Sequence, residues 1–268
     1  MNFRDFLNIS KICDAHIHLA DLYDLQAEFT NSPSYMCISC SHSQKEFMLN
    51  EKIKNASESK IISAFGIHPQ KPDLQNAAFL EELAKSSKIA AVGECGFDLF
   101  TPEFKLQLLE QTEAFLIQTE LAVKYNLPLI IHGRKCLELF FKYKKELSKV
   151  PAVIFHSFMG TYSESVSLLK SGINGLFSFS AQILKGNKKA VECVKKLPAE
   201  KIVFETDAPY QTLKGEKHTP QERILDVYLK AYKIRHDLET YEVNEKSSEF
   251  FEFVQLVNSN FDSVLKQS

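Results

Sequence analysis

The 268-residue sequence contains no apolar stretch long enough to cross a lipid bilayer. Its first segment, MNFRDFLNISKIC, also lacks the sustained apolar core of a signal peptide. Long linkers and low-complexity tracts are absent, and a content of 44% hydrophobic and 25% charged residues is typical of a globular protein. We therefore expect a single domain spanning residues 1–268, located in the cytoplasm and without membrane contact.

Cysteine is sparse as well. The six cysteines are scattered along the chain, unlike the dense disulfide framework of a small secreted protein: Cys13, Cys37, Cys40, Cys95, Cys136 and Cys193. Cys37 and Cys40 form a C-x-x-C pair, but no second pair follows it, and a lone pair is a weak signal for zinc or redox chemistry. Buried thiols are the favoured interpretation.

Neither sign of charge is in large excess. The formal net charge is −2 and the sequence pI is about 6.5. No overall basic field would attract nucleic acid, so a nucleic-acid substrate would have to be held by a local site. No pattern in the sequence indicates a protein partner.

Short apolar runs with strand character alternate with longer stretches of helical character. The runs are Ile12–His18, Tyr35–Ser39, Ile61–Ile67, Ile89–Glu94, Leu129–His132, Ala152–His156, Gly175–Phe179 and Ile202–Glu205. Between them, Thr101-Pro102 indicates a helix start, the apolar spacing over residues 102–125 is helical, and Thr161…Glu164 and Thr219…Glu222 fit the capping box. Eight strands alternating with helices predict a parallel sheet.

A doubly wound open sheet and an eight-stranded barrel both fit this alternation. Eight strands in about 200 residues favour the barrel. Six polar residues at or just past the carboxyl ends of strands favour it more strongly: His16, His18, Glu94, His132, His156 and Asp207. A barrel brings these ends to one mouth, whereas an open sheet would keep distant strands apart. We predict a (β/α)8 TIM barrel with a helical tail, from about Tyr241, that packs outside it.

The first strand carries a pair of histidines. His16 and His18 share one face because side chains at i and i+2 point the same way in a strand, so they can chelate one metal ion. Two ordinary polar residues at a strand end are the alternative. Asp14 is expected on the same face, deeper in the barrel, either orienting a ligand histidine or acting as a buried acid with its own hydrogen-bond partner.

Glu94 ends an apolar strand between two glycines, where its carboxylate could bridge two cations. An ordinary loop acid would look the same in isolation, and Asp98 is expected to be a loop or helix-cap acid. His132 and His156 each end an apolar strand, and either alone would be interpreted as a structural histidine.

Asp207 follows the last strand, beside the closure of the barrel with the first strand, which would place it next to His16 and His18. Glu205 shares its face and is a candidate to orient a ligand. Together, four histidines and two acids supply about three to four ligands for each of two metal ions. Mixed imidazole and carboxylate ligands suit Zn²⁺, Mn²⁺, Fe²⁺ or Ni²⁺, while sites for Mg²⁺ alone prefer oxygen.

Six motifs follow one another between about Ile12 and Tyr210: His16-x-His18, Gly66-Ile67-His68-Pro69, Gly93-Glu94-x-Gly96-x-Asp98, His132-x-Arg134, His156-x-Phe158 and Glu205-Thr206-Asp207-Ala208-Pro209-Tyr210. In this order they resemble the TatD family of metal-dependent deoxyribonucleases. The resemblance implies a barrel with a two-metal phosphodiesterase site. In it His16, His18 and Asp207 hold one cation, Glu94 bridges, and His132 and His156 hold the other. The family is usually regarded as magnesium-dependent, but the histidines suit softer ions, so Mg²⁺, Mn²⁺ and Zn²⁺ all stay open.

The sequence departs from the family pattern without losing a proposed metal ligand. Gln70 stands where a second histidine is common, Ser157 replaces a frequent cysteine, Gly133 replaces a serine, and Thr219-Pro220 replaces an Asn-Pro pair. These departures bear on the choice of substrate, since Gln70 is expected close to the cleft.

The resemblance predicts a deoxyribonuclease with DNA as its substrate. Two cations would acidify one water, which Asp207 would orient and deprotonate, with Glu94 between the ions. Arg134 and His68 are candidate contacts to phosphate, although Arg134 could form a salt bridge at a helix start and His68 a turn before proline. The same residues could serve an amidohydrolase, esterase or phosphatase acting on a small molecule, or a non-catalytic metal-binding protein.

Overall fold

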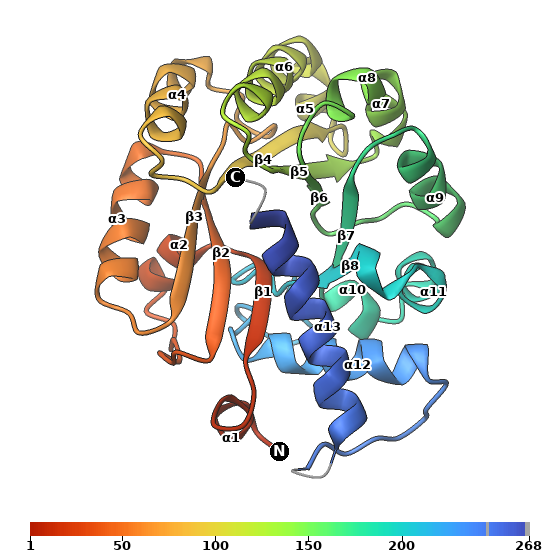
Figure 1. Ribbon diagram of the computed structural model, residues 1–268. Helices are drawn as coiled ribbons and strands as arrows, with labels where there is room; N and C mark the ends of the chain where they lie inside the picture. The colour runs from red at the N-terminus through yellow and green to blue at the C-terminus, as the bar shows by residue number, and fades with distance from the viewer. Residues whose placement is uncertain (245–246, 266–268) are drawn as a thin grey trace.

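The computed structural model describes residues 1–244 and 247–265. Eight parallel strands form one sheet in sequential order, and helices alternate with them around its outer face (Figure 1). The strands are β1 (Ile12–Ile17), β2 (Tyr35–Ser41), β3 (Lys60–Phe65), β4 (Ala91–Asp98), β5 (Leu129–Arg134), β6 (Val153–Phe155), β7 (Gly175–Phe179) and β8 (Ile202–Phe204). The predicted TIM barrel is confirmed, and each strand overlaps its predicted run.

The barrel closes between β8 and β1 just past the end of β8. The backbone N–H of Asp207 donates to the carbonyl of His16 over 3.0 Å, and the N–H of His18 donates to the carbonyl of Ala208 over 2.8 Å. The predicted juxtaposition of Asp207 with His16 and His18 is therefore confirmed, because these hydrogen bonds join the two segments directly.

Two of the three predicted helix starts are confirmed. The helices are α1 (Phe3–Leu7), α2 (Leu19–Asp24), α3 (Gln44–Asn55), α4 (Ala77–Lys85), α5 (Pro102–Leu106), α6 (Leu108–Lys124), α7 (Leu137–Lys142), α8 (Lys144–Leu147), α9 (Tyr162–Lys170), α10 (Ala181–Leu184), α11 (Lys188–Lys196), α12 (Arg223–Arg235) and α13 (Ser248–Leu265), with 3-10 turns η1 (Leu74–Asn76) and η2 (Ala199–Lys201). Thr101 caps α5 by accepting from the N–H of Phe104, and Thr161 and Glu164 form a capping box at α9.

One helical prediction needs correction. Residues 102–125, where the apolar spacing is helical, form the two helices α5 and α6. The capping box predicted at Thr219…Glu222 is wrong, because α12 begins only at Arg223. Thr219 instead donates its backbone N–H to the carbonyl of Pro209 over 2.9 Å, which ties it to the loop after β8.

The interior of the barrel is a cluster of apolar side chains that recur with a period of two. It comprises Cys13, Ala15, Ile38, Cys40, Ile62, Ala64, Ala91, Ile130, Ala152, Ile154, Leu176 and Val203 from the strands, together with Phe261 and Val264 from α13. Two residues beyond Ile130 and Ile154 are His132 and His156. The alternation that fills the barrel with apolar groups therefore also directs polar groups into its mouth.

Strand β1 interrupts this alternation. Asp14 pairs with Cys37 and Ile17 pairs with Ser39, so β1 carries one extra residue against β2 between these pairs. Ala15 belongs to the interior cluster, and after the irregularity His16 and His18 face the mouth. The expectation that Asp14 shares their face is wrong. Its carboxylate accepts hydrogen bonds from the hydroxyl groups of Tyr35 (3.0 Å) and Thr206 (2.7 Å). Asp14 therefore links β1 to β2 and to the segment just after β8.

Helix α13 lies across the barrel at the amino-terminal end of its strands (Figure 1). Asn260 donates from Nδ2 to the carbonyls of Ala199 (2.7 Å) and Ile202 (2.9 Å), and the Asn258 side chain accepts from the N–H of Cys13 over 3.1 Å. The predicted helical tail is thus confirmed over Ser248–Leu265, where it covers the end of the barrel, but it begins later than predicted because residues 241–244 and 247 are not helical. Residues 245–246 and 266–268 of that prediction lie outside the described residues.

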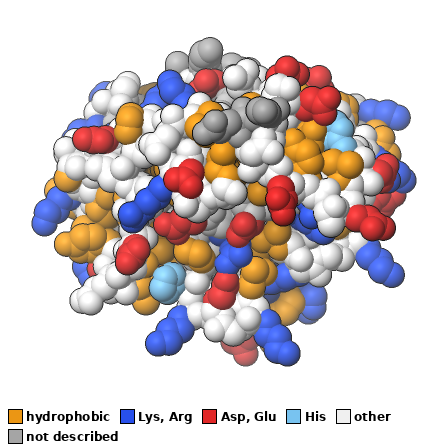
Figure 2. All heavy atoms as spheres, turned by 90° about the horizontal axis from the view of Figure 1, so that it is seen from below, with side chains coloured by type: hydrophobic (Ala, Val, Ile, Leu, Met, Phe, Trp, Pro, Cys, Tyr) orange, Lys and Arg blue, Asp and Glu red, His pale blue; other side chains and the backbone are white. Residues whose placement is uncertain are grey.

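All six cysteines are buried free thiols, as favoured by the sequence. Cys37 packs in the outer core and Cys40 inside the barrel, so the C-x-x-C pair faces opposite sides of β2. Within residues 1–244 and 247–265, no helix is long and apolar enough to span a bilayer. On the face shown in Figure 2, acidic and basic side chains are interspersed.

Candidate metal centre

A cavity of about 820 Å³ opens at the carboxyl ends of the strands. Its walls include five of the six predicted metal ligands, His18, Glu94, His132, His156 and Asp207, and also the predicted phosphate contacts His68 and Arg134. His16, the sixth predicted ligand, is fully buried next to them. The structure therefore brings the whole predicted set together at the mouth of the barrel.

Glu94 lies at the centre of this set and is only 2% exposed. Its Oε1 atom faces three imidazole nitrogens: Nε2 of His156 at 3.1 Å, Nε2 of His16 at 3.4 Å and Nδ1 of His132 at 3.6 Å. One carboxylate oxygen thus reaches histidines at the carboxyl ends of three different strands, β1, β5 and β6.

The other oxygen of Glu94 faces a second group of three histidines. Its Oε2 atom lies 3.3 Å from Nε2 of His42, 3.4 Å from Nε2 of His68 and 3.8 Å from Nε2 of His18. Six of the eight histidines in the chain therefore surround a single buried carboxylate.

Glycines around Glu94 let β4 approach its neighbour closely. Gly96 has a φ of +131°, and a Cβ atom there would lie 2.2 Å from the carbonyl oxygen of His132. Gly93 has a φ of +146°, and its Cβ would meet the carbonyl oxygen of Ile130 at 2.6 Å. Side chains at these two positions would push β4 away from β5 and displace Glu94 from the histidines.

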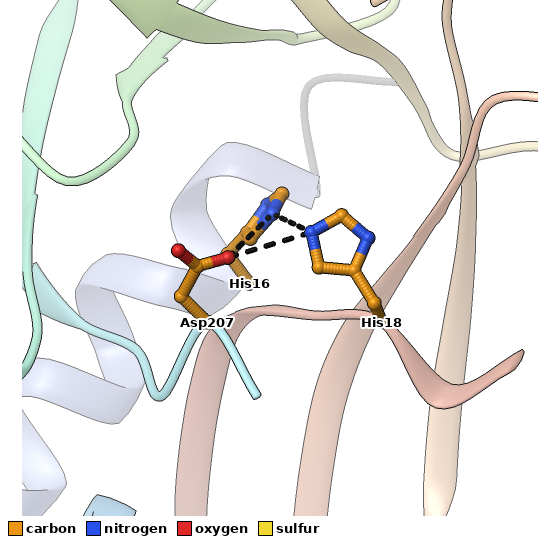
Figure 3. A group of neighbouring side chains, drawn as sticks. All are labelled: His16, His18 and Asp207. Atoms are coloured by element: carbon orange, nitrogen blue, oxygen red, sulfur yellow. Dashed lines mark hydrogen bonds and ion pairs between the residues drawn. The ribbon is translucent and has the colours of Figure 1, made fainter. Parts of the chain in front are cut away.

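Asp207 completes the group with His16 and His18 (Figure 3). Its Oδ1 atom lies 3.4 Å from Nε2 of His18 and 3.6 Å from Nε2 of His16, and these two nitrogens are 3.0 Å apart. Its Oδ2 atom accepts a hydrogen bond from Nε2 of Gln211 over 3.0 Å. Asp207 has a φ of +56°, a left-handed conformation that aspartate adopts more readily than most residues.

Two carboxylates lie behind the histidine rings. Glu205 places Oε1 2.9 Å from Nδ1 of His156, and its part in orienting this histidine stays a prediction. Asp98 places Oδ2 3.2 Å from Nε2 of His132 and also accepts from the side chain of Gln70 over 2.8 Å. The expectation of a loop acid at Asp98 is wrong, because β4 continues to this residue and buries it completely.

Among the described residues, the donor atoms form four overlapping groups suited to a metal ion, each with its ligand atoms within 4.8 Å of one another: His16–His18–Asp207, His16–Glu94–His156, His18–His42–Glu94 and His68–Glu94–His132. Oε1 of Glu94 and Nε2 of His42 are buried atoms without a hydrogen-bond partner. Such atoms cost free energy unless another group compensates them, and a cation shared by a carboxylate and imidazoles would do so. The residues present therefore fit divalent cations.

The electrostatics of the centre also favour cations. Burial opposes charge on His156, but the carboxylates of Glu205, Glu94 and Asp207 raise the pKa of this ring to about 10. A field that draws a proton onto a buried ring would equally attract a metal ion. Burial holds the pKa of His16 well below its usual range, so this ring is neutral and can offer a lone pair.

The predicted phosphate contacts lie at different depths. His68 points into the centre, next to Glu94, whereas Arg134 lies at the rim with 42% of its side chain exposed. The guanidinium of Arg134 lies 4.1 Å from the ring centroid of Phe100, and Nη1 is 3.6 Å from Asp98. Arg134 is therefore held in place while part of it still faces the cavity.

Sequence reasoning missed His42 and Gln211. His42 comes three residues after the predicted end of the second strand, but β2 extends to Ser41 and places it at the mouth. The signal that could have revealed it is the period of two through Ile38 and Cys40. Two departures from the family pattern also lie inside the centre: Gln70 donates to Asp98, and Ser157 donates to Glu205.

A model of the TatD-related DNase family matches residues 13–262. The 3'-5' ssDNA/RNA exonuclease TatD of Escherichia coli strain K12 is 34% identical to this chain over 157 residues, covering 55% of this chain and 58% of that protein. The uncharacterized metal-dependent hydrolase YabD of Bacillus subtilis strain 168 is 32% identical over 168 residues, covering 60% and 64%. The matched segments thus span less than two thirds of either relative.

Solved structures show the same fold at lower identity. The TatD homolog YJJV from Escherichia coli K12 superposes with a TM-score of 0.78 at 21% identity, covering 96% of this chain and 98% of that one. A TatD family hydrolase from Entamoeba histolytica gives a TM-score of 0.72 at 20% identity, with the same coverage. Because the family model spans the barrel and most of α13, with every predicted metal ligand inside the matched range, the chain belongs to the TatD-related DNase family.

Proposed function

We propose that this protein is a metal-dependent exonuclease that hydrolyses phosphodiester bonds of single-stranded DNA or RNA at a centre for two divalent cations. The observation that carries the proposal is the convergence of six histidines, Glu94 and Asp207 on the floor of an open cavity. Membership of the TatD-related DNase family and the printed activity of its Escherichia coli relative support nucleic acid as the substrate.

In this proposal His16, His18 and Asp207 would hold one cation, His132 and His156 would hold the other, and Glu94 would contribute to both. This role of Glu94 is supported by its carboxylate, which lies 3.4 Å from His16 and 3.8 Å from His18 of one set, and 3.6 Å from His132 and 3.1 Å from His156 of the other. The imidazole-rich ligand set favours Zn²⁺ or Mn²⁺ over Mg²⁺. When bound, such cations would acidify a water molecule and neutralise charge that develops on the phosphate.

Asp207 is the group best placed to handle the proton. Its Oδ1 atom faces the cation ligands His16 and His18, while Gln211 holds Oδ2 by a hydrogen bond of 3.0 Å. A carboxylate fixed in this way can orient the attacking water and accept its proton.

His68 and Arg134 are proposed to bind the phosphate. Nδ1 of His68 accepts from the backbone N–H of Gln70 over 3.2 Å, and burial holds the pKa of this ring well below its usual range. The neutral ring therefore carries its proton on Nε2 and can donate a hydrogen bond in the cavity. Arg134 offers a permanently charged, planar fork at the rim, which suits phosphate oxygens.

The test uses metal-stripped protein with 5'-labelled single-stranded DNA, and RNA of the same sequence, with or without Mg²⁺, Mn²⁺ or Zn²⁺. We expect metal-dependent shortening from the 3' end, and loss of turnover by about a thousandfold or more in Asp207→Ala. Asp24→Ala, which removes an exposed carboxylate from α2, is the matched control.

Two results would contradict the proposal. Near-normal activity of a folded Asp207→Ala protein would show that Asp207 is not the proton acceptor. Tight metal binding without cleavage of DNA or RNA would keep the metal centre and exclude the nuclease. A panel of amides, esters and phosphomonoesters would then identify a small-molecule hydrolase.

A further inference from the structure

We infer that His42 is an additional ligand of the cation held by His18 and Glu94, and that this fifth ligand imidazole makes the centre selective for Zn²⁺-class ions over Mg²⁺. The inference rests on the proposed metal centre and adds a residue to it. His18, His42 and Glu94 form one of the four groups whose ligand atoms lie within 4.8 Å of one another.

The barrel places His42 at the centre by the same rule as the predicted ligands. Ile38 and Cys40 belong to the interior cluster, and His42 is the next residue in this series of alternate positions. Its backbone N–H donates to Oε2 of Glu46 over 2.7 Å at the start of α3, which anchors the segment just after β2. Its side chain lines the cavity beside Glu94.

Hydrogen bonding determines which nitrogen of His42 can bind a metal. Nδ1 lies 3.4 Å from the carbonyl oxygen of Gly66, which can only accept, so Nδ1 carries the proton. In the neutral ring Nε2 then presents a lone pair. This atom is buried, has no hydrogen-bond partner, and lies 3.3 Å from Oε2 of Glu94. Two acceptors facing each other at this distance repel unless a cation is shared between them.

His68 faces the same oxygen of Glu94, but the proton of its ring lies on the other nitrogen. Its Nε2 atom lies 3.4 Å from Oε2 of Glu94, but Nδ1 accepts from the N–H of Gln70, so Nε2 carries the proton. Of the two neighbouring histidines, His68 therefore carries its proton on the nitrogen nearest Glu94, whereas His42 has a lone pair on the corresponding nitrogen.

The chemical consequence concerns the metal. Imidazole binds Zn²⁺, Co²⁺ and Ni²⁺ well, whereas Mg²⁺ prefers oxygen ligands and keeps several waters. A ligand nitrogen from His42 would raise the affinity of this position for Zn²⁺, Co²⁺ and Ni²⁺ and would change its affinity for Mg²⁺ little. A proton shared between His42 and Glu94 would satisfy the same two atoms, so the test must detect a metal–nitrogen bond.

The test titrates the metal-stripped full chain with Co²⁺, followed by its visible absorption, and then displaces Co²⁺ with Zn²⁺. We expect His42→Asn to weaken Co²⁺ and Zn²⁺ binding by about tenfold or more and to change the absorption band, with little effect on Mg²⁺ affinity. His236→Asn, at an exposed histidine beyond α12, should behave as the wild type. His68→Asn should weaken binding clearly less than His42→Asn.

Wild-type affinity and absorption in His42→Asn would overturn the inference, and so would equal losses in His42→Asn and His68→Asn. Absence of divalent-metal binding in the wild type would instead overturn the proposed metal centre itself. If His42→Asn does not fold, proton NMR of the Co²⁺-loaded wild type decides the question. Five strongly shifted exchangeable imidazole N–H signals support His42 as a ligand beside His16, His18, His132 and His156, and four signals contradict it.

Discussion

Glu205 and His156 form a direct pair beneath the floor of the cavity. Oε1 of Glu205 lies 2.9 Å from Nδ1 of His156, and the opposite nitrogen of the same ring lies 3.1 Å from Glu94. The carboxylate holds a proton on Nδ1, so that Nε2 is the nitrogen directed toward a metal ion, which would replace any proton there. Ser157 donates both its backbone N–H and its hydroxyl to the same oxygen, which holds the carboxylate in place.

The first prediction tests this pair. Glu205→Gln keeps the shape of the side chain but removes its charge, so we expect metal affinity to fall by about tenfold or more. Isothermal titration with Zn²⁺ measures the change. Glu200→Gln, at an exposed carboxylate in η2, should leave affinity unaltered. Unchanged affinity in Glu205→Gln would show that this carboxylate does not support a metal ligand.

The second prediction concerns the orientation of Asp207. Gln211 donates to Asp207 and to Ser157, and its own carbonyl oxygen accepts from Ser180 over 2.7 Å. Gln211→Ala frees Oδ2 of Asp207, so we expect kcat to fall by about tenfold while KM changes little, because the substrate contacts stay in place. The exposed Gln75→Ala in η1 is the control. A rise in KM with normal kcat would assign Gln211 to substrate binding instead.

The sequence predicted the barrel and its six central residues because both depend on a simple repeat. Apolar strands recur between helices, and the carboxyl ends of parallel barrel strands must meet. A polar residue that ends an apolar strand, such as His132 or His156, is therefore placed by the fold itself, without knowledge of the loops.

The residues that were missed or misplaced depend on pairing between strands. β2 continues through Cys40 and Ser41 because Ser41 pairs with Phe65 of β3, which brings His42 to the mouth. Asp14 and the two histidines do not share a face because the register against β2 shifts between Asp14 and Ile17, and no local pattern in β1 reveals this shift. Asp98 stays in β4 because Gly96 allows close contact with β5, although glycines normally suggest a loop.

The third prediction is that divalent cations stabilise the fold. A ligand that binds only the folded protein, at a hundred times its dissociation constant, adds about 2.7 kcal/mol to the free energy of unfolding. For a chain of this size we expect Zn²⁺ or Mn²⁺ to raise the Tm of metal-stripped protein by roughly 5–10 °C. Thermal unfolding followed by circular dichroism measures this shift, and Asp207→Ala should reduce it. The same Tm with and without the ions would contradict metal binding.

The fourth prediction separates the buried-thiol interpretation from redox chemistry at the C-x-x-C pair. Burial raises the pKa of Cys193 to about 12 and raises the pKa of the Cys37 and Cys40 thiols well above their usual range. Because the thiolate is the reactive form, the native protein should react with less than about one equivalent of Ellman's reagent at pH 8. All six thiols should react after unfolding in guanidinium. Rapid reaction of two thiols in the native state would instead support a redox role for Cys37 and Cys40.

The fifth prediction concerns the helix that covers the amino-terminal end of the barrel. Asn260 is 6% exposed, and its Nδ2 atom donates to the carbonyls of Ala199 and Ile202 at the start of β8. Asn260→Ala would leave both acceptors without this partner, so we expect the free energy of unfolding to fall by about 2–3 kcal/mol. Urea denaturation measures the loss, with Ser259→Ala on the exposed side of α13 as the control. Because the centre lies at the opposite end of the strands, metal affinity should stay the same. A loss of metal affinity equal to that of Glu205→Gln would show that α13 also positions the mouth of the barrel.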